Sequence, residues 1–148
     1  MLTGRENLTP REAAQISPVT LAFVGDAVYS LYVRERLTLE VGGKTAQLQR
    51  ASIKTVSAKG QSAFMDKLLP ALTEEEADVF RRGKNAKKAT KSKSASSLEY
   101  SRSTGFEAVI GYLYLLGRTE RLKELFALSV TEDFTAEEEV KPFKPVHR

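Results

Sequence analysis

The 148-residue sequence contains no cysteine, no tryptophan and a single histidine, His147, next to its last residue. Without cysteine the chain has no disulfide, no thiolate nucleophile, no zinc–thiolate site and no iron–sulfur cluster. One terminal histidine makes a Ser-His-Asp triad, an HExxH zinc site and a histidine proton shuttle unfavourable interpretations. Any catalysis must therefore use carboxylates, hydroxyls, lysine or tyrosine, with or without a hard metal ion.

The sequence also lacks a long hydrophobic run. Its longest apolar stretch, Ala108 to Leu116, has nine residues, whereas a membrane-spanning helix needs roughly 20. The N-terminal sequence MLTGRENLTPRE has no hydrophobic segment of the kind found in secretory signals. We therefore expect a cytoplasmic protein that does not enter a membrane. A length of 148 residues, with 41% hydrophobic positions, favours one domain with a packed core.

Positive charge is concentrated in one segment. The chain has 23 Lys and Arg residues against 19 Asp and Glu, a net charge of +4. Residues 81–102 hold eight basic residues and one acid, a net +7, so the rest of the chain carries −3. Lysines interleaved with Ser and Thr, as in KKATKSKSASS, can meet a phosphate backbone through ammonium and hydroxyl groups. A solvated loop whose lysines only aid solubility has the same composition, and composition leaves both interpretations open.

Helix signals recur along the chain, and strand signals do not. Thr9-Pro10-Arg11-Glu12 has the pattern of a capping box with proline at the first helical position, and it predicts a short helix. Ser17-Pro18 predicts a longer helix, in which apolar residues recur at helical spacing up to a polar end at Arg36. Residues 45–69 are predicted to be helical with a bend near Gly60, and the expected inward residues are Leu48, Ala51, Ile53 and Val56.

The second half of the chain continues this pattern. Thr73-Glu74-Glu75-Glu76 is another capping box and predicts a helix to about Gly83, followed by the basic loop. A strongly apolar helix is predicted from near Ser103 to Leu116, with Gly117 as its C-cap. Thr119 is the expected N-cap of a final helix that reaches Leu128. The elements together predict a single all-α domain with a loose, charged tail.

Two acidic residues lie within apolar helices, where solvation does not explain them. Asp26 lies in the segment LAFVGDAVY, and Glu107 lies in FEAVIGY. An ionised carboxylate against an apolar face costs several kcal/mol unless a cation or strong donors compensate for it. Each acid also has a glycine nearby, Gly25 or Gly111, which allows another backbone or a ligand to approach closely.

The two acids have two interpretations. Each could be paired with Arg or Lys, for example at an oligomer interface. Together, two carboxylates from two helices form an all-oxygen site of the kind that Mg²⁺ accepts, with water filling the remaining positions. Mg²⁺ beside a phosphate-binding segment favours phosphodiester hydrolysis, because the metal lowers the pKa of a bound water and neutralises charge in the transition state.

At these residues the sequence resembles a known family. Phe23-Val-Gly-Asp-Ala-Val-Tyr29 is similar to the signature helix of ribonuclease III domains, F-L-G-D-A-V-L. Phe106-Glu-Ala-Val-Ile-Gly-Tyr-Leu-Tyr114 is similar to their second acidic helix, F-E-A-L-I-G-A-L-Y. Arg82-Gly-Lys-Asn-Ala-Lys87 resembles the R-G-R-N-A-K segment of one branch, Mini-ribonuclease III, which has no attached double-stranded-RNA-binding domain. The resemblance covers about Ser17 to Leu128.

The resemblance implies roles for individual residues. Asp26 corresponds to the family's catalytic, metal-binding Asp, and Glu107 corresponds to its metal-binding Glu. Longer ribonucleases III carry two further acids, where this chain has Ala22 and Thr104, and the Mini-ribonuclease III branch resembles this chain in lacking them. Fewer protein ligands imply more water around the Mg²⁺. The residues expected to engage the RNA backbone are Arg82, Lys84, Asn85, Lys87, Lys88 and Lys91.

The resemblance also implies a substrate and an assembly. The family forms homodimers in which the signature helices pack across a two-fold axis and a valley accepts an RNA duplex, read largely by its shape and phosphates. It implies a catalytic domain over residues 1–130, with a basic loop at about 84–102, and a charged tail over residues 131–148. The role of the branch is maturation of the large-subunit (23S) ribosomal RNA precursor, and a ribosomal protein is a further candidate partner.

Two other functions are compatible with the sequence. A non-catalytic, ribosome-associated protein of the same fold would bind double-stranded RNA without cutting it; the two missing acids favour this function and the two present acids oppose it. A helix-turn-helix DNA-binding protein would use residues 45–64, which are predicted to be helical with a central break, but that pattern is a loose one.

Overall fold

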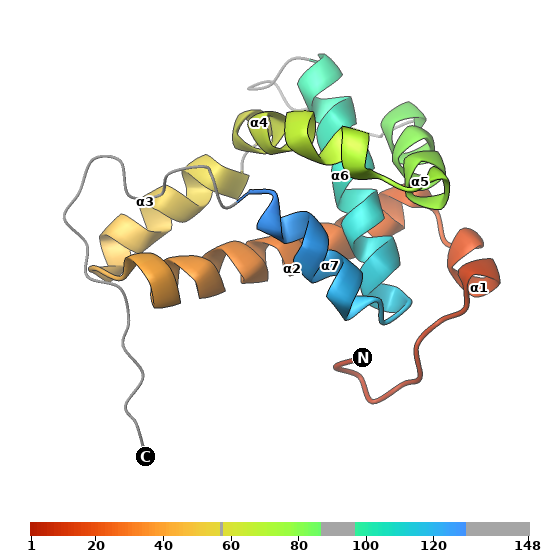
Figure 1. Ribbon diagram of the computed structural model, residues 1–148, viewed down its shortest axis with the longest axis horizontal. Coiled ribbons are helices and arrows are strands. Elements are labelled where there is room, and N and C mark those ends of the chain that lie inside the picture. Colours follow the sequence, from red (N-terminus) through yellow and green to blue (C-terminus); the bar gives the residue numbers. More distant parts are fainter. Residues whose placement is uncertain (57, 87–96, 130–148) are drawn as a thin grey trace.

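The computed structural model describes residues 1–56, 58–86 and 97–129. Throughout these residues the regular structure is helical, which confirms the predicted all-α class (Figure 1). None of the helices in the described ranges is long and apolar enough to cross a membrane. The elements are α1 (Pro10–Ala14), α2 (Pro18–Arg36), the π-helical turn η1 (Leu37–Val41), α3 (Thr45–Val56), α4 (Ala58–Leu68), the 3-10 turn η2 (Leu69–Ala71), α5 (Glu74–Asn85), α6 (Ser97–Leu115) and α7 (Thr119–Ala127).

The two predicted capping boxes, at the starts of α1 and α5, are confirmed. The Thr9 hydroxyl accepts a hydrogen bond from the Glu12 backbone N–H at 3.2 Å, and the Glu12 carboxylate accepts one from the Thr9 N–H at 3.0 Å. Thr73 and Glu76 make the same pair of bonds at 3.2 and 2.9 Å. Each box satisfies two backbone donors that a helix start would otherwise leave unpaired.

Three sequence predictions need correction. The apolar helix begins at Ser97 rather than near Ser103, because its polar first turns have the composition of the preceding basic loop. Thr119 is the first residue of α7 rather than its cap; the N-cap is Arg118, without a side-chain cap bond. Ile53 is 68% exposed rather than inward-facing, since α3 packs only along its other side. The charged tail after residue 130 and the loop at 87–96 lie outside the described residues.

The bend near Gly60 is present. At this residue the start of α4 comes so close to the end of α3 that a Cβ would collide with the Lys54 carbonyl oxygen. Glycine is therefore needed there for a close approach of two backbones rather than for an unusual backbone angle.

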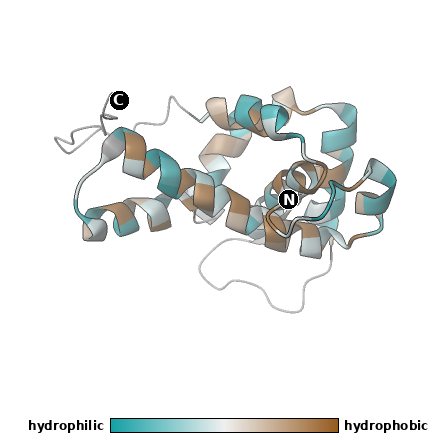
Figure 2. Ribbon diagram, turned by 90° about the horizontal axis from the view of Figure 1, so that it is seen from below, coloured by the Kyte–Doolittle hydropathy of each residue, from teal (hydrophilic) through white to brown (hydrophobic). Residues whose placement is uncertain are grey.

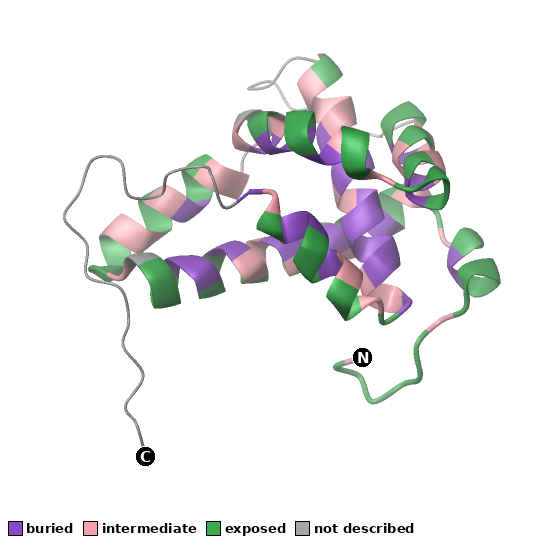
Figure 3. Cartoon of the chain, viewed as in Figure 1, coloured by how far each residue is buried: buried purple, intermediate pink, exposed green. Residues whose placement is uncertain are grey.

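The core forms around α6, which packs against α2 and α5 more extensively than other helix pairs do. The second half of α6 is buried almost continuously (Figure 3). Tyr29 of α2 meets Phe106 of α6 edge to face, with ring centroids 5.0 Å apart, and Tyr32 stacks on Phe126 of α7 at 4.1 Å. These aromatic contacts fix α2, α6 and α7 against one another.

Candidate active site at the crossing of α2 and α6

The backbones of α2 and α6 touch where the two acidic helices cross. A Cβ on Gly25 would collide with the carbonyl oxygen of Glu107 and would lie 2.8 Å from the backbone nitrogen of Gly111. A Cβ on Gly111 would collide with the carbonyl oxygen of Leu21. The crossing therefore requires glycine on both helices. Because Asp26 follows Gly25 directly, the fold brings the backbone positions of Asp26 and Glu107 together.

Asp26 lies on the solvent side of this crossing, and its predicted apolar surroundings are absent in the single chain. Asp26 is exposed, and its neighbour one turn earlier, Phe23, is 79% exposed. The reason is that α6 covers the opposite face of α2, which contains Leu21, Gly25 and Tyr29. Within the described residues, no side chain or backbone N–H forms a hydrogen bond or ion pair with the Asp26 carboxylate. That carboxylate is therefore available to a ligand.

Glu107 is half-buried on α6 and is held from its own helix. The Ser103 hydroxyl lies 3.3 Å from its carboxylate, one helical turn away. Ser103 in turn donates to the Gln61 side-chain oxygen on α4 at 2.5 Å. Helical spacing places Ser103 on the face of Glu107, but nothing in the sequence indicates Gln61, which is 42 residues away from Ser103.

The donor set fits a hydrated Mg²⁺ ion. In the described ranges, no group of three or more His, Cys, Asp or Glu side chains could hold a metal. Ala22 and Thr104 are both buried, and the Thr104 hydroxyl donates to the Tyr100 carbonyl at 3.1 Å, so neither position adds a carboxylate. Asp26 and Glu107 offer carboxylate oxygens only. Mg²⁺ accepts such ligands and commonly keeps several waters when protein ligands are few.

The expected RNA-binding residues divide into two groups. Lys84 and Asn85 are exposed at the C-terminal end of α5. Arg82 is half-buried, and its guanidinium lies 3.5 Å from the Ala14 carbonyl oxygen of α1, so it also links α5 to α1. The remaining predicted residues lie outside the described ranges: Lys87, Lys88 and Lys91.

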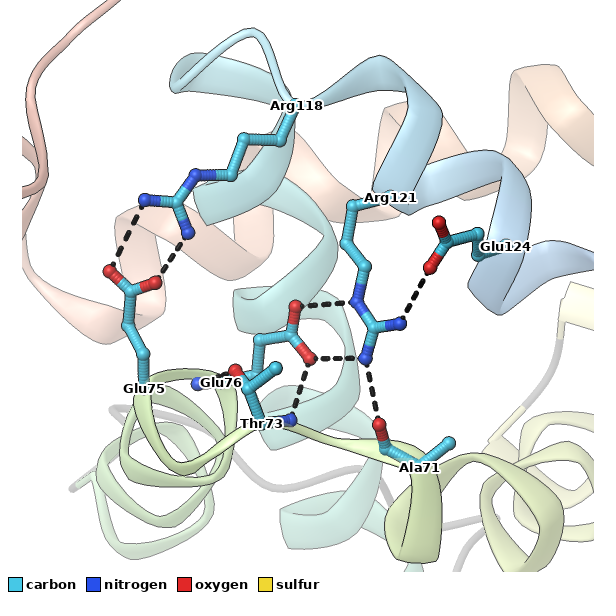
Figure 4. Close-up of polar contacts among 7 residues, drawn as sticks. All are labelled: Ala71, Thr73, Glu75, Glu76, Arg118, Arg121 and Glu124. Carbon is cyan, nitrogen blue, oxygen red and sulfur yellow. Dashed lines mark hydrogen bonds and ion pairs between the residues drawn. The ribbon is translucent and has the colours of Figure 1, made fainter.

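An ion-pair cluster holds α5 in place (Figure 4). Arg121 of α7 binds the buried Glu76 carboxylate with two donors, each at 2.8 Å, and also donates to the Ala71 carbonyl at 2.7 Å. Arg118 pairs with Glu75, which also accepts a hydrogen bond from Tyr112 at 2.8 Å. These contacts join the start of α5 to the end of α6 and to α7.

The same contacts shift several pKa values. Burial acts to raise the pKa of Glu76, but the hydrogen bonds from Arg121 and from the Thr73 backbone outweigh it and hold that pKa below the ordinary value. The Arg118 hydrogen bond lowers the pKa of Glu75. Burial, together with the hydrogen bond to Glu75, raises the pKa of Tyr112 to about 12. The two carboxylates therefore stay ionised at neutral pH.

The outer face of α2 exposes several large apolar side chains. Val19, Phe23 and Leu31 are all exposed, although α2 also buries apolar residues against α6. Figure 2, which views the molecule from below, shows hydrophobic segments recurring along this helix. At the C-terminal end of α2, a groove of about 480 Å³ lies between α2, η1 and α3, with Arg34, Leu37 and Leu48 in its lining. An apolar face of this kind next to a groove is typical of an interaction surface.

Comparison with known proteins supports a relationship over most of the chain. Residues 19–118 match the family model for the ribonuclease III domain. The chain is 49% identical over 119 residues to a Mini-ribonuclease 3 of Symbiobacterium thermophilum, covering 80% of this chain and 90% of that protein. It is 43% identical over 129 residues to a Mini-ribonuclease 3 of a Thermoanaerobacter species, covering 87% of this chain and 91% of that protein.

A solved structure shares the fold. The crystal structure of a Fusobacterium nucleatum protein superposes with a TM-score of 0.70 and is 32% identical in sequence. The match covers 78% of this chain and 93% of that one. The similarity therefore extends over nearly the whole length of the compared chain.

Proposed function

Since the chain belongs to the ribonuclease III domain family, in its Mini-ribonuclease III branch, and is an endoribonuclease of double-stranded RNA, we propose that Asp26 and Glu107 hold the Mg²⁺ ion for hydrolysis. The observation that carries this proposal is the contact between the backbones at Gly25, Glu107 and Gly111. That contact brings the backbone positions of two acids, on two helices, to one crossing, in a chain with a single histidine and no cysteine.

The protein's own residues bind and orient. When bound, Mg²⁺ supplies a water of lowered pKa and neutralises negative charge on the phosphate. The Asp26 carboxylate, exposed and without a partner among the described residues, is open to solvent and to RNA. Glu107 approaches from α6 and is held by Ser103. The two acids fix where the attacked phosphodiester must lie, because both carboxylates are on rigid helices that touch beside them.

The basic residues are proposed to bind the RNA backbone. Lys84 and Asn85 support this role because they are exposed at the end of α5, which the ion-pair cluster of Glu75, Glu76 and the two arginines holds in position. Arg82, Lys87, Lys88 and Lys91 complete the proposed surface. Contacts to phosphate suffice to bind an A-form duplex, because its deep major groove is not accessible to protein side chains.

The active form is proposed to be a homodimer that pairs through α2. Exposed Phe23 and Leu31 support this assembly, because a monomer gains nothing from presenting them to water. In an antiparallel pairing of two α2 helices about a two-fold axis near Ala27, Phe23 of one copy would meet Leu31 of the other. The two Asp26 residues would then lie on either side of one shared valley.

The proposed substrate is the precursor of large-subunit ribosomal RNA, cleaved in the cytoplasm. Similarity to proteins named Mini-ribonuclease 3 over 80–87% of the chain supports this role, since the maturation of that RNA is the role associated with the branch. A ribosomal protein that presents the RNA is a proposed additional partner.

Cleavage of a long RNA duplex tests the metal site. The purified protein is incubated with the duplex at a series of Mg²⁺ concentrations, beside Asp26→Asn and Glu107→Gln variants. We expect the parent to cut only with Mg²⁺, and both variants to bind RNA with at least a hundredfold slower cleavage. Cleavage that persists in Asp26→Asn, or binding by the parent without any cleavage, would contradict the proposal.

A further inference from the structure

A connected set of polar side chains links α4 to Glu107. Gln61, on α4, is 1% exposed, and Ser103, on α6, is 7% exposed. The Ser103 hydroxyl lies 2.5 Å from the Gln61 side-chain oxygen and 3.3 Å from the Glu107 carboxylate. The Gln61 side-chain nitrogen donates to the Val56 carbonyl at 3.0 Å. A buried amide and a buried hydroxyl thus form a chain of contacts that leads to the Glu107 carboxylate.

The hydrogen bond to Val56 determines which atom of the Gln61 amide faces Ser103. Since the amide nitrogen is held by that carbonyl, the amide oxygen is the atom that faces Ser103. Ser103 is therefore the donor to both acceptors, and its single hydroxyl proton is shared between the Gln61 oxygen at 2.5 Å and the Glu107 carboxylate at 3.3 Å. Buried polar groups without partners are costly, so this set of contacts is stable only with all its members present.

We propose that Ser103 is a positioning residue for Glu107 and that Gln61 holds Ser103 in place. This inference rests on the proposed role of Glu107 as a metal ligand. The Glu107 side chain has several rotatable bonds, and the hydroxyl one turn earlier restricts the rotamer in which its carboxylate can approach the metal. The restriction matters because the described residues hold no cluster of three or more metal-binding side chains that could compensate for a misplaced Glu107.

Metal binding by Ser103→Ala tests this role. Mn²⁺ replaces Mg²⁺ as the probe, and its binding to the protein without RNA is followed by electron paramagnetic resonance. Loss of a group that orients a metal ligand commonly weakens metal binding or activity by about 10- to 100-fold. Because the contact to Glu107 is long, we expect Ser103→Ala to weaken Mn²⁺ binding about tenfold. The Mg²⁺ concentration for half-maximal cleavage should rise in parallel, with the KM for RNA unchanged.

Ser129→Ala is the matched control. Ser129 is 6% exposed, and its hydroxyl bonds to Phe126 and Tyr32, away from Glu107. Both substitutions remove a buried hydroxyl, so both should lower the melting temperature, but only Ser103→Ala should weaken Mn²⁺ binding. Equal Mn²⁺ binding by Ser103→Ala and Ser129→Ala would overturn the inference.

Two further variants complete the test. In a Glu107→Gln background, adding Ser103→Ala should change Mn²⁺ binding no further, since Ser103 acts through Glu107; an additional loss would overturn the inference. Gln61→Met should also weaken Mn²⁺ binding, but less than Ser103→Ala does. Unchanged Mn²⁺ binding by Gln61→Met would show that Gln61 has no part in positioning Glu107. If Glu107→Gln alone binds Mn²⁺ as the parent does, the proposed metal site fails instead.

Discussion

Gly25 and Gly111 are single residues without a functional group, yet the position of both acids depends on them. Hydrogen is the only substituent that fits at either position, because main-chain atoms of the other helix occupy the space of a Cβ. The sequence indicated this role, since each glycine lies close to an acid within an apolar helix. It could not indicate that Asp26 faces solvent, because the periodicity of α2 places apolar residues on both its covered and uncovered faces.

Gly25→Ala tests the crossing at the scale of one residue. In an exposed helix interior this change stabilises by up to about 1 kcal/mol, because alanine has the higher helix propensity. Here we expect destabilisation of about 1–3 kcal/mol, since the added methyl group collides with the Glu107 carbonyl. The free energy of unfolding in urea measures the effect.

Ala77→Gly is the control for Gly25→Ala. Ala77 is exposed within α5, away from the crossing and from α2, so this change should cost only about 1 kcal/mol of propensity. A Gly25→Ala protein as stable as the parent would show that the two helices can separate without cost.

At the scale of elements, the capping boxes were easier to predict from the sequence than the other helix starts or the buried faces. The capping boxes at Thr9 and Thr73 depend on residues three apart, and both were predictable without knowledge of the fold. The exposure of Ile53 was not, because the face of α3 that becomes buried is chosen by distant helices. The link from Arg121 to Glu76 likewise joins residues 45 apart, and neither side chain carries a sequence signal for the other.

Removal of the Glu76 carboxylate tests the attachment of α5 to α7. Glu76 is 2% exposed, and Glu76→Gln leaves Arg121 with the exposed Glu124 as its remaining charged partner, so we expect a loss of about 3 kcal/mol at pH 7. Glu124→Gln is the control: Glu124 also pairs with Arg121 but is mostly exposed, and its loss should cost under about 1 kcal/mol. Thermal unfolding of the two variants and the parent provides the comparison.

The same pair predicts a pH dependence. The pKa of Glu76 is lowered from 4.5 in the folded protein, so the parent binds fewer protons there when folded than when unfolded. Its contribution to stability is full above pH 4.5 and is lost as the pH falls through the folded value. Glu76→Gln should therefore lose less stability than the parent between neutral pH and the acid range. Equal losses in both proteins would contradict this assignment.

At the scale of the whole molecule, charge and apolar surface lie in different places. Lys84 lies at the C-terminal end of α5, and most of the basic residues of the segment 81–102 come after α5 in the sequence. Three exposed large apolar side chains, in contrast, lie along α2: Val19, Phe23 and Leu31. The charge distribution was predictable by counting residues. The excess of apolar residues on this helix is also visible in the sequence, but a helix with apolar residues all around it does not show which of them stay exposed in the single chain.

Phe23→Asp tests the proposed dimer. Phe23 is 79% exposed in the single chain, so its replacement should leave the fold intact while placing a charge in the paired surface. We expect sedimentation equilibrium to show dimers for the parent and monomers for Phe23→Asp. Leu98→Asp, at an exposed apolar residue of α6, should remain dimeric. A parent that is monomeric at all concentrations would reject the assembly.

The crossing of α2 and α6 has a consequence for how freely the rest of the protein can vary. Where two helices touch through side chains, each exchange of a large residue for a small one alters their separation. Here the separation is set by main-chain atoms, which are the same in every amino acid. The surrounding core can therefore be rebuilt, by natural drift or by design, while the spacing between the two acidic positions stays constant. Activity and core composition are, to that extent, independent properties of this chain.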